Sequence, residues 1–187
     1  PRPGDRPRDR GRSGQESASG RAEIPVCAPL PLVDRQDGAP EDERVVQESR
    51  LDAAAVRALG YRHAEVETAG SMEETMATLV ENPVYDFFPV GLRLVGRDAV
   101  RTYYDHLFEH FLPFVESTHL VREWAGEDAL TQEYVVHLRK DGVVERHFII
   151  GILYVEGSLL GGERIWGSER TLRRLLGPLY DRLTPIP

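Results

Sequence analysis

One stretch decides the fold: Phe148-Ile149-Ile150-Gly151-Ile152-Leu153-Tyr154-Val155. It contains no charged residue, and its apolar side chains fall on both faces of an extended chain. This pattern is typical of a strand covered on both sides, which predicts helices on one side and a partner subunit on the other. Outward from it, alternating patterns and the turns Asp141-Gly142 and Glu156-Gly157 predict a run of strands: Thr118–Trp124, Ala129–Arg139, Val143–Val155 and Leu159–Trp166.

The residues before these strands show helical spacing. Apolar positions from about Asp42 to Ala69 predict an amphipathic helix, with Gly60 as a candidate break. Ser71 and Glu74 have the spacing of a capping box, which predicts a second helix over residues 72–80 that ends at Asn82-Pro83. The other expected elements are two short strands, a third helix and a closing helix capped by Ser168: Val84–Phe88, Leu92–Val95, Arg97–Phe111 and the segment after Ser168.

This order of elements predicts an α+β fold. Helices gathered on one face of a curved antiparallel sheet form two layers, and helices across the mouth of such a sheet leave an apolar pocket instead of a solid core. We expect this domain to span residues 41–184. Residues 1–40 are expected to form a disordered or extended tail, because the segment up to Gly20 is rich in Arg, Pro, Gly and Ser and has almost nothing to bury.

The charge of the chain argues against two classes of partner. The net charge is -8 and the pI is about 5.3. An acidic surface repels the phosphate backbone of nucleic acids and the negative leaflet of a membrane, and no apolar run reaches the roughly 20 residues that span a bilayer. Cys27 is the only cysteine, so no internal disulfide can form, and this suits a cytoplasmic protein.

Three local sequences resemble the nuclear transport factor 2-like superfamily, and the likeness covers about Asp52 to Leu183. They are similar to the opening helix pair, the start of the third helix, and the last strand with the closing helix of SnoaL-like domains. The sequences are His63-Ala64-Glu65-Val66-Glu67-Thr68-Ala69-Gly70-Ser71-Met72-Glu73-Glu74-Thr75-Met76-Ala77-Thr78-Leu79, Gly96-Arg97-Asp98-Ala99-Val100-Arg101-Thr102-Tyr103-Tyr104, and Gly162-Glu163-Arg164-Ile165-Trp166 with Leu172-Arg173-Arg174-Leu175-Leu176-Gly177. The resemblance implies a cone-shaped sheet with helices across its mouth. It implies less about chemistry, because the superfamily includes polyketide cyclases, limonene epoxide hydrolases, ketosteroid isomerases, dehydratases and non-catalytic domains.

The likeness to limonene epoxide hydrolases is incomplete. Tyr85 matches their water-orienting Tyr. Their Arg and paired Asp fall near Phe148, Ile150 and Ile165, and all three positions are apolar here. Without a carboxylate pair to activate water, classical epoxide hydrolysis is not expected.

The likeness to the isomerases and cyclases is incomplete as well. His63 and Ile150 fall where ketosteroid isomerases carry the Tyr and Asp of their oxyanion hole, and Asp86 falls near their base. Ser168 stands where SnoaL-like cyclases carry an acid after the last strand. No single enzyme class of the superfamily has its full residue set in this chain.

His63 and Glu67 are the candidate catalytic residues. They lie four positions apart on the first predicted helix and continue the stripe set by Ala55, Val56 and Leu59, so both side chains should face the pocket. There they can act as a general acid–base pair, with the carboxylate raising the pKa of the imidazole. The alternative is an ordinary ion pair on the surface.

Five more residues are candidates for binding the substrate: Tyr85, Tyr104, Glu163, Asp86 and Trp166. The two tyrosines can supply hydroxyl groups, although a tyrosine stripe also fits a core with its hydroxyls at the rim. Glu163 can supply a carboxyl group, but the period of the strand leaves open which face it occupies.

The third predicted helix contains His106-Leu107-Phe108-Glu109-His110, which matches the inverted zinc motif H-x-x-E-H. No segment supplies a third ligand, and Leu107 and Phe108 belong to the apolar stripe of the helix. A solvated helix face is the better interpretation, and we expect neither a metal nor a cofactor.

These residues predict a protein that binds a small, largely apolar metabolite of polyketide, terpenoid or steroid-like size. As an enzyme it would isomerise, dehydrate or cyclise that molecule by proton transfer, with His63 as the acid–base group and Glu67 as its orienting partner. The alternative is a non-catalytic ligand-binding or dimerisation domain. The apolar stretch Phe148–Val155 also predicts a homodimer through the outer face of the sheet.

Overall fold

A computed structural model describes residues 50–187. The predicted tail over residues 1–40 and the expected start of the first helix near Asp42 lie outside the described residues. No helix among residues 50–187 is long and apolar enough to cross a membrane.

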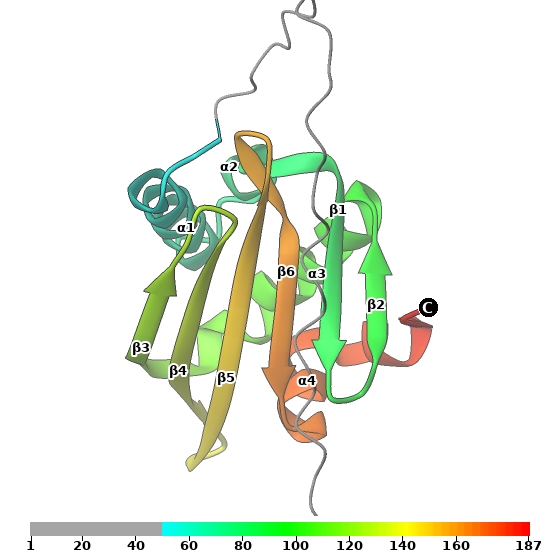
Figure 1. The fold of residues 1–187 in the computed structure, drawn as a ribbon. Helices are drawn as coiled ribbons and strands as arrows, with labels where there is room; N and C mark the ends of the chain where they lie inside the picture. Colours follow the sequence, from blue (N-terminus) through cyan, green and yellow to red (C-terminus); the bar gives the residue numbers. More distant parts are fainter. Residues whose placement is uncertain (1–49) are drawn as a thin grey trace, which may run out of the picture. The chain divides into compact units, whose positions relative to one another are not determined.

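Seven strands form one sheet in the order β3-β4-β5-β6-β1-β2-β7 (Figure 1). Strands β3 to β6 form the antiparallel meander that the sequence predicts. Strand β1 joins this meander through a parallel pairing with β6, and the long crossover that such a pairing requires is supplied by β2, the third helix and the meander itself. The strands are β1 Leu79–Phe88, β2 Leu92–Val95, β3 Val115–Ala125, β4 Ala129–Lys140, β5 Val143–Glu156, β6 Leu159–Gly167 and β7 Thr184–Pro185.

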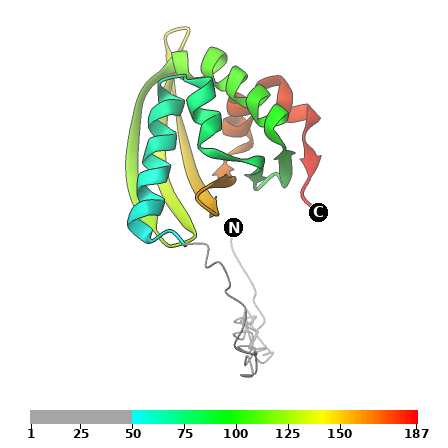
Figure 2. The ribbon, with the colours of Figure 1, turned by 90° about the horizontal axis from the view of Figure 1, so that it is seen from above.

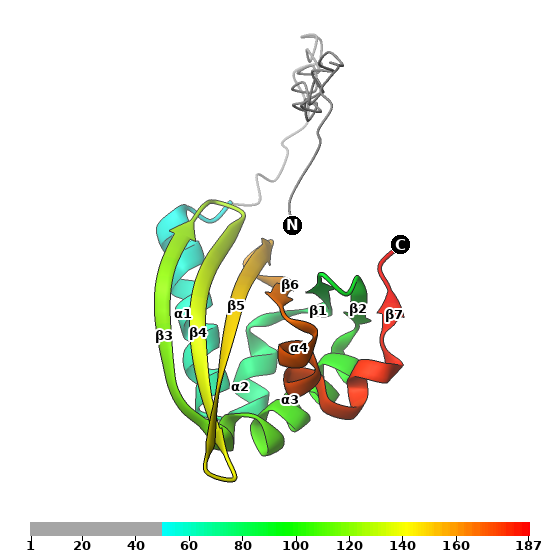
Figure 3. The same ribbon diagram turned by 90° about the horizontal axis from the view of Figure 1, so that it is seen from below.

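Helices cover the concave face of this sheet, as the predicted α+β fold requires. Figures 2 and 3 show strands β3, β4 and β5 bending around α1 and α2. The Asp52 side chain caps α1 by accepting a hydrogen bond from the Ala55 amide at 2.7 Å. The helices are α1 Ala53–Thr68, α2 Met72–Ala77, α3 Arg97–His110 and α4 Glu169–Leu176, with 3-10 helices η1 Leu112–Phe114 and η2 Gly177–Arg182.

Strand β5 contains the stretch that decides the fold, and its side chains alternate between two environments. Ile149 and Leu153 are buried under the helices, whereas Phe148 and Ile150 on the outer face remain 55% and 40% exposed. The single chain therefore covers one side of this apolar strand and leaves the other side open.

Two predicted boundaries differ from the structure. The second helix ends at Ala77, and Leu79 already begins β1, which continues through Pro83 to Phe88. The pairing of β1 with β6 shifts register between Leu79 and Val84, so the proline lies at an irregularity where the strand tolerates it. Its carbonyl oxygen accepts a hydrogen bond from the Gly96 amide at 2.9 Å.

Two predicted features of the helix pair also differ. Gly60 does not break α1, which runs unbroken through it. Ser71 is the N-cap of α2, but its side chain makes no capping hydrogen bond. Glu74 bonds instead to Arg62 of α1 at 3.0 Å, so the expected capping box does not form.

The solid part of the core lies between α3, α4 and strands β1, β2 and β6. Its largest buried members include Phe87, Leu160, Leu172 and Leu176. Between α1 and the bent strands β3 to β5 the interior is hollow, and this hollow holds the candidate site.

Candidate functional site

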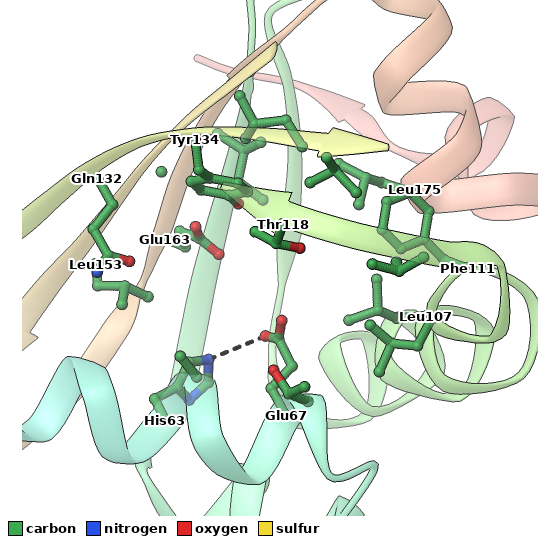
Figure 4. A pocket seen from close by; sticks show the side chains of 18 of the residues that line it. His63, Glu67, Leu107, Phe111, Thr118, Gln132, Tyr134, Leu153, Glu163 and Leu175 are labelled. Carbon is green, nitrogen blue, oxygen red and sulfur yellow. Dashed lines mark ion pairs between the residues drawn. The ribbon is translucent and has the colours of Figure 1, made fainter. Parts of the chain in front are cut away.

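A cavity of about 420 Å³ lies between α1, α3 and strands β3 to β6 (Figure 4). This volume is within the range of small-molecule binding pockets. Most of the wall is apolar, formed by Leu107, Phe111, Leu112, Val115, Val136, Ile149, Leu153, Ile165 and Leu175. The polar and aromatic lining residues are Tyr61, His63, Glu67, Thr68, Tyr103, Thr118, Gln132, Tyr134 and Glu163.

The cavity opens between α1 and the edge strand β3. Among its lining residues, the exposed ones are Tyr61 and Thr68 on α1 and Thr118 and Leu120 on β3. A ligand would therefore enter past the open edge of the sheet.

His63 lies in the wall that α1 contributes, and its tautomer follows from its neighbours. The side chain is only 2% exposed, and Nδ1 lies 2.6 Å from the Thr78 hydroxyl. That hydroxyl donates its proton to the Thr75 carbonyl oxygen at 2.6 Å, so it can only accept from His63. Nδ1 therefore carries a proton, and Nε2 is the atom that can gain or lose one.

Two buried tyrosines continue this chain of hydrogen bonds on the other side of the ring. Tyr104 lies 3.0 Å from His63 Nε2, and the Tyr85 hydroxyl lies 2.7 Å from that of Tyr104. Neutral His63 accepts from Tyr104, which in turn accepts from Tyr85. Burial raises the pKa of both phenols well above the usual value, so both stay protonated. Neither tyrosine lines the cavity, so they hold the imidazole in place and do not reach a ligand directly.

Glu67 lies one helical turn after His63 and faces the same space. Its Oε2 is 3.5 Å from His63 Nε2, the pair marked by the dashed line in Figure 4. The Glu67 side chain is 28% exposed, whereas that of His63 is 2% exposed, so the carboxylate forms the part of the pair that a ligand can touch.

Glu163 projects from β6 into the same cavity. Its neighbour Arg164 is exposed on the outer face while Ile165 is buried, which settles the orientation that the strand period left open. Gly151 on the adjacent β5 makes room for the carboxyl group, because a Cβ there would overlap Glu163 Oε1. Among residues 50–187, no hydrogen bond or ion pair joins this carboxyl group to the protein.

The surroundings of Glu163 keep it protonated at neutral pH. The side chain touches the cavity but is otherwise surrounded by protein, and this burial, followed by the negative charge of Glu67, raises its pKa to about 8. Figure 4 shows the carboxyl groups of Glu67 and Glu163 pointing into the same space from α1 and from the sheet. The cavity thus holds a neutral acid facing a histidine–carboxylate pair.

Like the two tyrosines, two further candidate substrate-binding residues do not line the cavity, which leaves Glu163 as the only one of the five that does. Asp86 and Trp166 are on the outer face of the sheet, because they alternate with the inward residues Tyr85 and Ile165. Both Asp86 oxygens accept hydrogen bonds from Arg93, at 2.6 and 2.9 Å. The Trp166 ring stacks on Phe88 at 4.4 Å.

The sequence interpretation missed several lining residues on β4 and at the mouth. Gln132 and Tyr134 occupy the inward positions of β4, between the buried Leu130 and Val136. The alternation of the strand places both side chains on the inner face. Polar groups on an inner face indicate a cavity there, so the sequence pattern could have predicted these two lining residues. Burial, with the charges of Glu163 and Glu67, raises the pKa of Tyr134 well above its usual value.

The H-x-x-E-H segment has a structural environment of its own. His106 Nε2 lies 3.4 Å from the Arg174 carbonyl oxygen, and the rings of His106 and His110 are 5.1 Å apart. Glu109 is exposed. Within residues 50–187, no group of three or more His, Cys, Asp or Glu side chains has a metal-holding arrangement.

Comparison with solved structures shows that the chain has the nuclear transport factor 2-like fold. A putative ketosteroid isomerase from Kribbella flavida matches with a TM-score of 0.51 and 19% identity, covering 62% of this chain and 79% of that one. SalBIII, an epoxide hydrolase/cyclase-like enzyme in pyran ring formation of the polyether salinomycin, matches at 0.54 and 12%, covering 64% and 95%. A limonene epoxide hydrolase-like enzyme from M. tuberculosis matches at 0.51 and 15%, covering 67% and 90%. No protein-family model and no curated protein matches the sequence.

Proposed function

We propose that this chain, with its nuclear transport factor 2-like fold, is an enzyme that isomerises, dehydrates or cyclises a small, largely apolar metabolite by proton transfer, without a cofactor. One observation carries the proposal: a neutral carboxyl group, Glu163, faces the His63–Glu67 pair across an apolar cavity. An acid and a base whose environments differ in this way are the usual arrangement for proton transfer at neutral pH.

His63 and Glu67 together move the proton. When Nε2 takes up a proton it becomes a donor, the Tyr104 hydroxyl turns to donate to Tyr85, and the imidazolium has Glu67 as its counterion, 3.5 Å away. Nδ1 keeps its proton and donates it to the Thr78 hydroxyl oxygen throughout, so the ring does not turn as the charge changes. Tyr104 is a positioning residue for this ring.

Glu163 positions the substrate from the opposite wall. While it is protonated, its hydroxyl can donate a hydrogen bond to an acceptor on the ligand. The apolar lining then holds the rest of the molecule by burial. The isomerase and cyclase-like enzymes among the structural neighbours support a pocket of this kind, although sharing a fold does not transfer a reaction.

Proton transfer can be tested without knowing the substrate. The protein is incubated in D₂O with a panel of apolar ketones and β,γ-unsaturated ketones, and NMR follows deuterium uptake or double-bond migration. We expect protein-dependent exchange on at least one compound. Glu67→Gln and His63→Gln should each slow it by about 10²–10⁴-fold, the usual contribution of a general acid–base group.

Glu65→Gln is the matched control for Glu67→Gln. Glu65 is exposed on the same helix and pairs with Arg62 at 3.3 Å, away from the cavity, so its loss should leave the rate unchanged. If exchange persists in both Glu67→Gln and His63→Gln, these two residues do not transfer the proton.

We also propose a homodimer through the outer face of β3 to β5, compatible with either a catalytic or a purely binding role. This face carries three large, exposed apolar side chains: Trp124 is 54% exposed, Phe148 55% and Ile150 40%. Exposed apolar patches of this kind usually mark an interaction surface.

A further inference from the structure

Apart from His63, the side chains of the cavity that can carry a charge near neutral pH are acids. Among its lining residues Glu67 and Glu163 are acids, and there is no Lys or Arg. His63 is the one lining residue that can become a cation, and both of its ring nitrogens are already engaged by Thr78, Tyr104 and Glu67. The protein therefore offers an anionic ligand group almost nothing to bind.

Glu163 lacks a partner within the described part of the chain. No hydrogen bond or ion pair within residues 50–187 satisfies it, and its partly buried side chain faces the cavity. Burial of an unpaired carboxyl group is costly, and Gly151 preserves the space that the group needs. The cavity therefore contains an acid whose partner can be supplied by a ligand.

We propose that the ligand carries a basic nitrogen, which binds as an ammonium ion against the Glu163 carboxylate while its apolar body fills the rest of the cavity. The inference rests on the proposed function only in taking this cavity as the ligand site, and it does not require turnover.

The electrostatics of the cavity favour a cation. Tyr103 and Tyr134 have pKa values well above the usual value, first because of burial and then because both acids repel a phenolate. The same negative charges attract an ammonium ion. The aromatic rings of Tyr103, Tyr134 and Phe111 belong to the lining, and cations are attracted to such rings.

Binding of an ammonium ion changes the protonation of the site. The O–H bond of the Glu163 carboxyl group breaks, its proton leaves to solvent, and the carboxylate pairs with the ammonium. The groups that face Glu163 are Glu67 and His63 from α1, Tyr103 from α3 and Tyr134 from β4. The tyrosines stay protonated, so the proton released near neutral pH comes from Glu163.

The test compares naphthylmethylamine with naphthylmethanol, which differ only in the nitrogen. Isothermal titration calorimetry at about pH 7 in phosphate and in MOPS gives the affinity and, from the difference in heat, the protons exchanged. We expect the amine to bind about tenfold more tightly or better, with release of about one proton. The alcohol should exchange none.

Glu163→Gln should abolish the proton release and bring the two affinities to within about twofold of each other. Glu65→Gln should behave like the wild type, and thermal unfolding of Glu163→Gln shows whether the variant is folded. Equal or tighter binding of the alcohol, amine binding without proton release, or failure of both probes to bind at millimolar concentration would overturn the inference. The exchange assay on ketones is independent of these results, so either proposal can fail alone.

Discussion

Glu163 links the stability of the molecule to pH. Its pKa in the folded chain is about 8, raised first by burial and then by the charge of Glu67. In the unfolded chain the group ionises near the ordinary value for a glutamic acid, 4.5. The folded state therefore holds this proton more tightly. Its contribution to stability is complete below the unfolded pKa and is lost as the pH rises toward the folded pKa.

We expect Glu163→Gln to gain stability relative to the wild type as the pH rises. The two chains should differ least at about pH 5, and the gap should grow to about 3–5 kcal/mol by pH 8.5, because only the wild type must ionise a buried acid. Urea unfolding at both pH values measures the gap. Glu65→Gln, exposed on α1, should show no such trend; a pH-independent gap for Glu163→Gln would show that the carboxyl group is solvated.

Individual residues of the site differed in how well the sequence could place them. The helix period indicates that His63 and Glu67 share a face, because Leu59 and Val56 set the buried stripe one and two turns before His63. The structure puts the side chains of His63 and Glu67 in the cavity wall. Asp86 could not be placed in this way. A strand alternates by one residue, and an error of one position moves a side chain to the other face.

At the level of the helix, α1 depends on a residue that helix propensity disfavours. Gly60 is buried, and a Cβ there would overlap Leu130 Cδ2 and lie 3.4 Å from Leu153 Cδ1. The glycine thus lets the helix approach β4 and β5 closely.

We expect Gly60→Ala to destabilise the domain by about 1 kcal/mol, because overpacking of about 1–3 kcal/mol outweighs a propensity gain of about 1 kcal/mol. Chemical denaturation measures the change. Ala58→Gly on the exposed side of the same helix should also cost about 1 kcal/mol, here through propensity alone. A stabilised Gly60→Ala would mean that Leu130 moves aside freely.

The order of the elements was largely predictable, and the errors have local causes. Helix α3, the four meander strands and the Ser168 cap lie within a few residues of their predicted positions, because each has a clear period and a clear terminator. The start of β1 was missed because Pro83 was read as a terminator. Only the pairing of β1 with β6, which is formed by residues far apart in the sequence, shows that a proline is tolerated there.

For the whole molecule, we expect light scattering at micromolar concentration to give twice the chain mass of 21.1 kDa. Ile150→Glu should yield a monomer, because a charge would be buried at the centre of the proposed interface. Val95→Glu is the control, since Val95 is 47% exposed on β2, away from β3 to β5. If the wild-type protein is a monomer, the outer face of the sheet is not a dimer interface.

The close approach of Gly151 to Glu163 has a consequence beyond this one chain. The two positions form no bond, yet a side chain at position 151 would occupy the volume that the carboxyl group now fills. Chains descended from the same ancestor should therefore substitute the two positions as a pair. A larger residue at 151 should be accompanied by a small or apolar one at 163, and the loss of the acid would mark lineages in which the cavity has changed its ligand.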